Sequence, residues 1–147
     1  MERYTEIDVL IESLEEEHKE NIPNSFAVMK PKLIEYIEGE KMVMAFPVLE
    51  WQLNPRGAMQ GGFITAAFDN VFGACCVYEA KERSIATVDI STTYQRPIFK
   101  NDELIITVWI KSKGKTLIHL LGEGYNKEGK LIATANTNFI LLNNKNK

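Results

Sequence analysis

The chain has 147 residues, of which 45% are hydrophobic and 25% are charged, and its formal net charge at pH 7 is −3. This length suits one domain large enough to bury a core, and the ordinary apolar content argues against a disordered chain and against a disulfide scaffold. The slightly negative charge argues against a general nucleic-acid-binding surface.

Targeting and metal-binding patterns are missing from the sequence. No apolar run reaches the ~18 residues that a membrane span needs, because Asp69 interrupts the longest candidate. Residues 1–6 lack the apolar core of a signal peptide, so we expect a cytoplasmic protein without a membrane partner. The two histidines and two cysteines form no cluster at ligand spacing, so we expect no metal site. Cys75 and Cys76 lie in an apolar segment and are expected to be small buried hydrophobic residues.

The first half of the chain predicts a helix, two strands and a second helix. Thr5 begins a capping-box-like pattern before an apolar stripe, which predicts an N-terminal helical extension within residues 1–24. Two strands are predicted at residues 33–38 and 41–49. After a loop at 51–62 that is rich in Asn, Pro and Gly, residues 63–78 are apolar on nearly every side, as in a helix buried in a core.

The second half predicts four strands with little between them. They cover residues 84–95, 103–111, 116–125 and 130–142, and a polar tail follows at 143–147. The first of these strands alternates, which would place Thr87, Asp89, Ser91 and Thr93 on one face and Ala86, Val88, Ile90 and Tyr94 on the other. We expect a single α+β domain over residues 1–147, in which an antiparallel sheet carries one long helix against a face.

Asp69 is the only residue between Arg56 and Glu79 whose side chain is ordinarily charged at neutral pH, and it lies inside the predicted buried helix. Burying an unpaired carboxylate is costly, so this side chain needs either a partner or a function. One interpretation is a structural carboxylate supported by Thr65 or Asn70. The other is a nucleophile or general base in an apolar pocket.

Gly61 and Gly62 immediately precede this helix. A helix N-terminus offers unpaired N–H groups and a partial positive charge, so it could hold a developing oxyanion, although a simple turn is the alternative. Asp69 lies eight residues beyond Gly61, roughly 12 Å along a helix axis. If both residues serve one site, they must come from different subunits. A two-fold dimer with antiparallel central helices would then form two equal sites.

A set of short motifs, in this order along the chain, resembles the hotdog-fold acyl-CoA thioesterases of the PaaI/4-hydroxybenzoyl-CoA thioesterase type. The motifs are Asn54, Gly57, Gln60-Gly61-Gly62, Asp69, Ala86–Ile90, Tyr94–Pro97 and Gly129–Ala133. The resemblance covers roughly residues 25–142. It implies a long helix wrapped by an antiparallel sheet, a homodimer with sites at the interface, and often a homotetramer of two dimers. It also implies an acyl thioester substrate, with coenzyme A present as part of the substrate and no separate cofactor.

By position, three residues match the family's catalytic groups. Asp69 matches the catalytic carboxylate, and Gly61 matches the backbone N–H of the oxyanion hole. Asn54 matches a polar residue that orients the attacking water or the carboxylate. The implied reaction is hydrolysis of an acyl thioester to a free acid and a thiol, in which Asp69 of the other chain attacks directly or activates water.

Three further residues are expected to bind substrate. Thr87 matches a Ser or Thr near the site on the partner chain, and Gly62 continues the glycine pair. Gln60 stands where the family usually has histidine. Glutamine can donate a hydrogen bond toward a thioester carbonyl, but it cannot take up a proton.

Two other functions on the same fold are alternatives. A non-catalytic acyl-CoA-binding module fits the departure at Gln60, since a fold does not fix a function. A hydratase or dehydratase would need a histidine beside the carboxylate, and His119 is the candidate. Trp51, Phe68 and Phe72 could line an acyl pocket, although aromatic residues beside a buried helix more often belong to the core.

Overall fold

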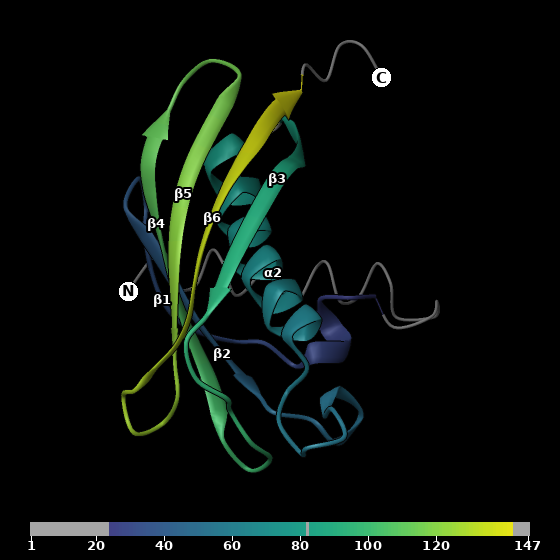
Figure 1. Ribbon diagram of the computed structural model, residues 1–147. Helices are drawn as coiled ribbons and strands as arrows, with labels where there is room; N and C mark the ends of the chain where they lie inside the picture. Colours follow the sequence, from purple (N-terminus) through teal and green to yellow (C-terminus); the bar gives the residue numbers. More distant parts are fainter. Residues whose placement is uncertain (1–23, 82, 143–147) are drawn as a thin grey trace.

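A six-stranded antiparallel sheet curls around one long helix in the computed structural model, which describes residues 24–81 and 83–142 (Figure 1). The strands follow the order β1-β2-β4-β5-β6-β3 across the sheet. The elements are η1 (Ala27–Met29), β1 (Lys32–Ile37), β2 (Lys41–Pro47), η2 (Glu50–Gln52), α2 (Gly61–Ala80), β3 (Ser84–Tyr94), β4 (Glu103–Lys113), β5 (Leu117–Tyr125) and β6 (Leu131–Leu142). The hotdog arrangement predicted from the sequence is therefore confirmed, and each predicted strand and the long helix begin and end within two residues of the observed bounds. The expected helix after Thr5 and the expected polar tail lie outside the described residues.

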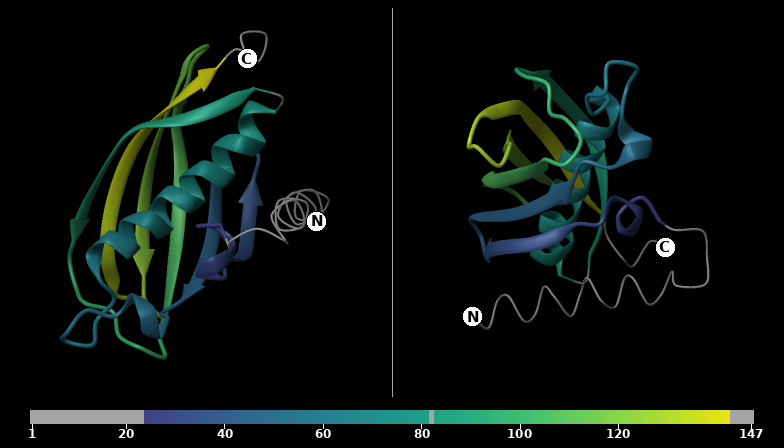
Figure 2. Two further views of the ribbon diagram at one scale, coloured as in Figure 1. Left: turned by 90° about the vertical axis from the view of Figure 1, so that its right-hand side faces the viewer. Right: turned by 90° about the horizontal axis from the view of Figure 1, so that it is seen from below.

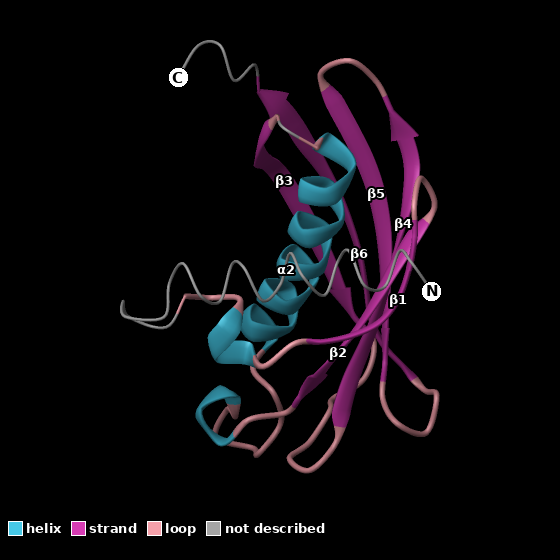
Figure 3. Ribbon diagram, turned by 180° about the vertical axis from the view of Figure 1, so that it is seen from behind, coloured by secondary structure: helices cyan, strands magenta, loops and turns pink. Residues whose placement is uncertain are grey.

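The long helix α2 lies diagonally across the inner face of the sheet (Figures 2 and 3). One stripe of its side chains is buried against the strands, and this stripe consists of Ile64, Ala67, Phe68, Val71, Phe72, Cys75, Cys76, Glu79 and Ala80. The opposite stripe, which includes Ala66, Gly73, Ala74 and Val77, is only partly buried. The helix is thus buried along one side in the single chain, rather than on every side as predicted.

Two glycines of β5 allow α2 to approach the sheet closely. A Cβ atom at Gly122 would lie 3.0 Å from ring carbons of Phe68 and 3.1 Å from one of Phe72. These two rings stack with centroids 6.1 Å apart, and both side chains are fully buried. At Gly124 an added Cβ would likewise meet Leu104 at 3.1 Å. The absence of side chains at these positions sets the distance between the helix and the sheet.

A buried carboxylate fastens the last turn of α2 to the sheet. Glu79 accepts hydrogen bonds from the Tyr36 hydroxyl at 2.5 Å and from the Gly39 N–H at 2.7 Å. The Lys113 ammonium lies 3.4 Å from the same carboxylate and donates to the Glu79 carbonyl at 2.9 Å. Burial, with the Glu79 hydrogen bond adding to it, raises the pKa of the Tyr36 phenol well above its ordinary value. The phenol therefore remains a donor at neutral pH.

A β-bulge interrupts the alternation of β3. Thr87 pairs with Phe139 of β6 and Asp89 pairs with the next residue, Asn138, so Val88 is an extra residue in the ladder. Thr87 and Ile90 both face α2. Ile90 follows Thr87 by three positions, and a regular strand would place the two side chains on opposite faces. The predicted face shared by Thr87 with Asp89 is therefore wrong, because the bulge moves every later side chain to the opposite face.

The contact at Gly122 gives a stability prediction. Gly122→Ala should lower the free energy of unfolding by about 1–3 kcal/mol, because the new methyl group would meet fully buried aromatic rings that have no room to move. Urea unfolding at fixed protein concentration measures the change. Gly114→Ala is the matched control, since a Cβ there would meet only the Leu117 carbonyl oxygen at 3.7 Å. Equal stability of the two variants would contradict the proposed close packing.

Candidate active site

Two hollows flank α2 and divide four of the predicted site residues between them, whereas Gln60 and Gly62 line neither. The N-terminal hollow, about 350 Å³, is lined by Asn54, Ala58, Met59, Gly61, Ile64, Tyr94, Gln95, Arg96 and Pro97. The Asp69 groove, about 310 Å³, is lined by Asn24, Ser25, Phe26, Asp69, Asn70, Gly73, Ala74, Val77, Thr87 and Phe139. Asn54 and Gly61 therefore share one hollow, and Asp69 and Thr87 share the other.

The N-terminal hollow ends at the exposed first turn of α2. Gln60 is the N-cap residue, with φ −65° and ψ 137°, and its side chain makes no capping hydrogen bond. Among the described residues, the backbone N–H groups of Gly61 and Gly62 donate to no hydrogen-bond acceptor. The first turn therefore presents two free backbone donors and the positive end of the helix dipole.

The Asn54 side chain stabilises the loop before the helix, whereas the Gln60 side chain lies over the first turn of the helix. The Asn54 carboxamide oxygen accepts hydrogen bonds from the N–H groups of Arg56, at 2.9 Å, and Ala58, at 3.1 Å. This leaves the Nδ2 group of Asn54 as the part of the side chain available to a ligand. The Gln60 carboxamide folds back over Gly62, where its oxygen lies 2.8 Å from the position of an added Cβ, and Gln60 does not line the N-terminal hollow.

Tyr94 is a residue of this hollow whose role the sequence did not indicate. Its hydroxyl donates to the Gly61 carbonyl at 2.7 Å and lies 2.7 Å from the Thr65 hydroxyl, which in turn lies 2.9 Å from the Thr92 hydroxyl. A Cβ at position 61 would lie 2.9 Å from the Tyr94 ring. Glycine at this position therefore lets the ring pack against the first turn of the helix. The contact between Tyr94 and Gly61 depends on the register of β3, which the sequence alone does not reveal.

The Asp69 carboxylate is partly buried in the wall of the second hollow. Thr87 donates a hydrogen bond from its hydroxyl to Asp69 Oδ1 at 3.0 Å, and no described residue donates to Oδ2. Thr65 and Asn70, the supports expected from the sequence, make their side-chain hydrogen bonds to other residues. Thr65 belongs to the Tyr94 cluster, and the Asn70 amide donates to the Ser25 carbonyl at 3.0 Å. One carboxylate oxygen is thus anchored and the other is available for chemistry.

The single chain does not bring Gly61 and Asp69 together. Both lie on α2, a straight 20-residue helix in which eight residues correspond to about 12 Å along the axis. Each residue opens into a different hollow. A thioester carbonyl held at the first turn of the helix is therefore out of reach of the carboxylate on the same chain.

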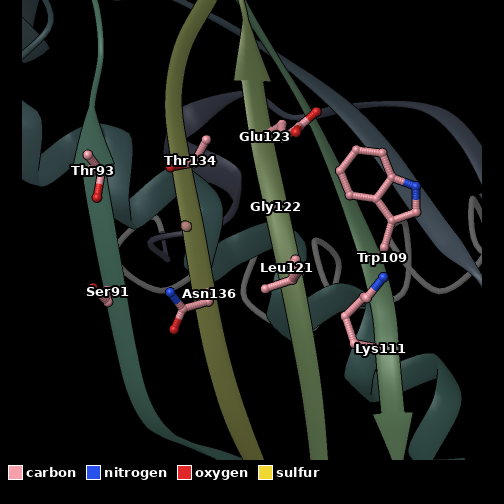
Figure 4. A pocket seen from close by; sticks show the side chains of 10 residues that line it. Ser91, Thr93, Trp109, Lys111, Leu121, Gly122, Glu123, Thr134 and Asn136 are labelled. Carbon is pink, nitrogen blue, oxygen red and sulfur yellow. The ribbon is translucent and has the colours of Figure 1, made fainter.

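A larger hollow, about 530 Å³, lies on the outer face of the sheet, on the side away from α2 (Figure 4). Strands β3 to β6 contribute its walls, among them Ser91, Thr93, Trp109, Leu121 and Asn136. The sheet itself separates this surface from Gly61 and Asp69. The outer hollow is therefore not part of the arrangement around the helix.

The other residues that the sequence suggested for a site, one histidine and three aromatic residues, make contacts away from Asp69 and Gly61. His119 Nδ1 lies 3.0 Å from the Asn138 carboxamide oxygen, so the histidine that a hydratase would need is not beside Asp69. Phe68 and Phe72 pack against the sheet rather than lining either hollow, and Trp51 is 49% exposed and packs edge-on against Phe63. The two phenylalanines are therefore core residues.

The cysteines are buried and form no disulfide, as predicted. Burial, followed by the nearby Glu79 carboxylate, raises the pKa of Cys76 to about 12, so its thiol stays protonated at neutral pH. Across residues 24–81 and 83–142, no three His, Cys, Asp or Glu side chains gather in a way that could hold a metal ion. Within the same residues, no helix is long and apolar enough to cross a membrane.

Comparisons with known sequences match the region that contains Gly61, Asp69, Thr87 and Tyr94. The family model of the thioesterase superfamily matches residues 56–133, more than half of the chain. Acyl-coenzyme A thioesterase 13 of Mus musculus is 30% identical over 95 residues, which cover 64% of this chain and 68% of that protein. The human protein of the same name is 29% identical over 94 residues, with 63% and 67% coverage.

Solved structures share the arrangement of helix and sheet. The PaaI protein of the E. coli phenylacetic acid degradation operon superposes with a TM-score of 0.74 at 20% identity, covering 80% of this chain and 83% of that one. A Streptococcus pneumoniae hypothetical thioesterase solved with coenzyme A gives 0.70 at 20% identity, with 76% and 85% coverage. At these identities the structures support the fold alone. Together with the sequence matches, they establish that this chain belongs to the thioesterase superfamily and has the hotdog fold.

Proposed function

We propose that the protein hydrolyses acyl-CoA thioesters at two equal sites in a homodimer. Each site combines the N-terminal hollow of one chain with the Asp69 groove of the other. One observation carries this proposal: α2 holds the free N–H donors and the Asp69 carboxylate in separate hollows of the same chain. A second chain is therefore needed to bring the two kinds of group to one substrate. The relatives named acyl-coenzyme A thioesterase 13 and the neighbour solved with coenzyme A support an acyl-CoA substrate.

The edge of the sheet supports the dimer. Strand β3 lies at one end of the strand order, so one side of its 11 residues has no neighbouring strand within residues 24–81 and 83–142. A long unpaired edge is a template for pairing with another chain. Antiparallel pairing of two β3 strands about a two-fold axis would extend the sheet and place the two α2 helices side by side in opposite directions. Gly61 of one chain would then approach Asp69 of the other.

The first turn of α2 is the proposed oxyanion hole. The thioester carbonyl oxygen accepts a hydrogen bond from the Gly61 N–H, with the Gly62 N–H beside it. As the tetrahedral intermediate forms, negative charge develops on this oxygen, and fixed donors at the positive end of a helix stabilise it more than they stabilise the ground state. Tyr94 supports these donors from behind, since its hydroxyl binds the Gly61 carbonyl, which shares a peptide group with the Gly62 N–H.

Asp69 supplies the attack by one of two routes. As a nucleophile, its free oxygen bonds to the carbonyl carbon, the C–S bond breaks with the electron pair leaving on the thiolate, and water hydrolyses the resulting anhydride. As a general base, Asp69 removes a proton from a water molecule that attacks the same carbon, and the thiolate leaves in the same way. Single-turnover hydrolysis in water labelled with heavy oxygen separates the routes, because label enters the Asp69 carboxylate only in the first.

The other predicted residues take supporting roles. Thr87 fixes the Asp69 carboxylate through its hydroxyl, and the Nδ2 group of Asn54 orients the attacking water or the carboxylate across the interface. Gln60 can swing from Gly62 toward the substrate carbonyl as a neutral donor. Coenzyme A enters only as part of the substrate. A homotetramer of two such dimers and a cytoplasmic location stay predictions.

Hydrolysis distinguishes this proposal from the alternative of a non-catalytic binding module. A panel of acyl-CoA substrates is assayed by release of free thiol, and binding is measured in parallel by calorimetry. Release that depends on Asp69 supports the enzyme. Tight binding by the parent protein with no thiol release from any substrate would support the module.

Replacing the carboxylate should abolish most of the activity. Asp69→Ala should lower kcat by about a hundredfold or more, because attack loses its nucleophile or base. Asp69→Asn keeps the size of the side chain and its capacity to bind Thr87. Its kcat should fall by a similar factor, because the amide can act neither as nucleophile nor as base. Unchanged hydrolysis by both variants would contradict the catalytic role of Asp69.

Mixed dimers test whether sites are shared. Gly61→Pro removes the N–H of the first helical residue, and the extended conformation of Gln60 suits a following proline. The added ring would also displace the Tyr94 side chain, so both effects disable the proposed oxyanion hole. Each homodimer of Asp69→Ala or Gly61→Pro should be inactive. A heterodimer of the two should regain activity approaching half that of the parent, since one of its sites carries both changes and the other carries neither. No recovery in a folded heterodimer would place each site within one chain.

Tyr94→Phe tests the support behind the oxyanion hole. The variant keeps the ring against Gly61 and loses only the hydroxyl, so kcat should fall roughly threefold to tenfold, the effect of one neutral hydrogen bond of ~1 kcal/mol. KM should change little, because the donors act mainly in the transition state. Tyr125→Phe is the matched control, since that hydroxyl donates to Glu123 and not to α2. A rise in KM at constant kcat would show that Tyr94 acts in binding instead.

A further inference from the structure

We propose that the Asp69 groove holds an aliphatic acyl chain and that Gly73 sets how long this chain can be. This inference rests on the proposed function and specifies its substrate. The groove begins at the candidate catalytic carboxylate, and its volume of about 310 Å³ lies at the lower end of the range for small-ligand pockets. Beyond Asp69 it is walled mainly by Phe26, Ala74, Val77 and Phe139.

The chemistry of the lining selects the acyl end of the substrate. Among the described residues, Asp69 is the only charged side chain that lines the groove, and no lysine or arginine contributes to it. Nucleotide phosphates would need cationic or backbone donors there. A hydrocarbon chain instead gains from the removal of its surface from water against these apolar walls. The thioester carbonyl would therefore lie beside Asp69, with the acyl chain running into the groove and the nucleotide pointing away.

The groove runs along the helix in the C-terminal direction. Asp69, Gly73 and Val77 recur every four residues, so they lie on one face of α2. From Asp69 to Val77 this face extends about 12 Å. A chain entering at the carboxylate passes Gly73 after about one helical turn.

Gly73 is not required by packing within the described chain. Apart from its chain neighbours and the adjacent helix backbone, a Cβ at this position would meet no heavy atom within 4 Å, unlike the crowded positions Gly61 and Gly122. Glycine inside a helix is also less favourable than alanine. The missing side chain therefore has no structural cause in the single chain, and its effect is to keep the floor of the groove open.

The wall opposite the sheet is held in place by polar contacts. The Asn70 amide donates to the Ser25 carbonyl at 3.0 Å and lies 3.3 Å from the Met29 sulfur. The Asn24 carboxamide oxygen accepts from the N–H groups of Phe26, at 3.1 Å, and Ala27, at 2.8 Å. Phe26 is thereby fixed beside α2, so the groove is bounded on two sides.

Chain-length selectivity tests the inference. Gly73→Leu should block the groove, so the ratio of kcat/KM for lauroyl-CoA to that for butyryl-CoA should fall by about tenfold or more. Gly73→Ala, which adds a single methyl group and folds readily, should shift the ratio in the same direction by a smaller factor. Gly114→Leu, the same substitution at an exposed turn, should leave the ratio unchanged.

Two results would overturn the inference. The first is an unchanged ratio in both Gly73 variants. The second is an equal loss on all chain lengths together with dissociation of the dimer in analytical ultracentrifugation, which would show that a partner chain occupies the groove.

Binding of non-hydrolysable thioethers separates this inference from the proposed function. Gly73→Leu should weaken binding of dodecyl-CoA about tenfold or more and leave binding of butyl-CoA nearly unchanged. If this holds while Asp69→Ala retains full hydrolysis, the catalytic assignment fails and the groove stands. If hydrolysis depends on Asp69 while neither selectivity nor thioether binding responds at Gly73, only the groove assignment fails.

Discussion

The packing of α2 into the curled sheet is the constraint on which the rest of the structure depends. Phe68 and Phe72 fit against β5 only because Gly122 leaves room for their rings, and Glu79 fixes the far end of the helix through Tyr36. A helix held at its middle and at its end has a fixed axis and a fixed rotation. The positions of Gly61 and Asp69 relative to the sheet follow from this rigid placement, and so does the distance that keeps them apart.

The same helix therefore has two faces with different tasks. Its buried stripe includes the large side chains of Ile64, Phe68 and Phe72 and packs into a core that the strands largely supply. Its opposite stripe contains small residues, one carboxylate and one amide, and it remains only partly buried in the single chain. Functional residues placed on a rigid element hold their geometry better than residues on a mobile loop. A partner helix or a substrate can approach this stripe closely because its side chains are small.

The fold and the main candidates were predictable because they depend on local patterns. Alternating strands, a continuous apolar helix and one isolated carboxylate are all visible in the order of residues. The partners of these residues were not predictable, since they depend on register between distant segments. Thr87 meets Asp69 because the bulge at Val88 changes the face of β3, and Tyr94 reaches Gly61 from the other end of that strand. Thr65, a neighbour of Asp69 in sequence, contacts Tyr94 instead.

The bulge also explains how one strand can serve both hollows. Before Val88, Thr87 points to the carboxylate in the middle of α2, and after it Thr92 and Tyr94 point to the first turn. An uninterrupted β3 that placed Thr87 toward the helix would turn Tyr94 away from it, because Tyr94 follows Thr87 by an odd number of positions. The extra residue brings both onto the helix side. A single irregularity at the edge of the sheet thus connects the support of the carboxylate to the support of the N–H donors, at the strand that we propose pairs with a second chain.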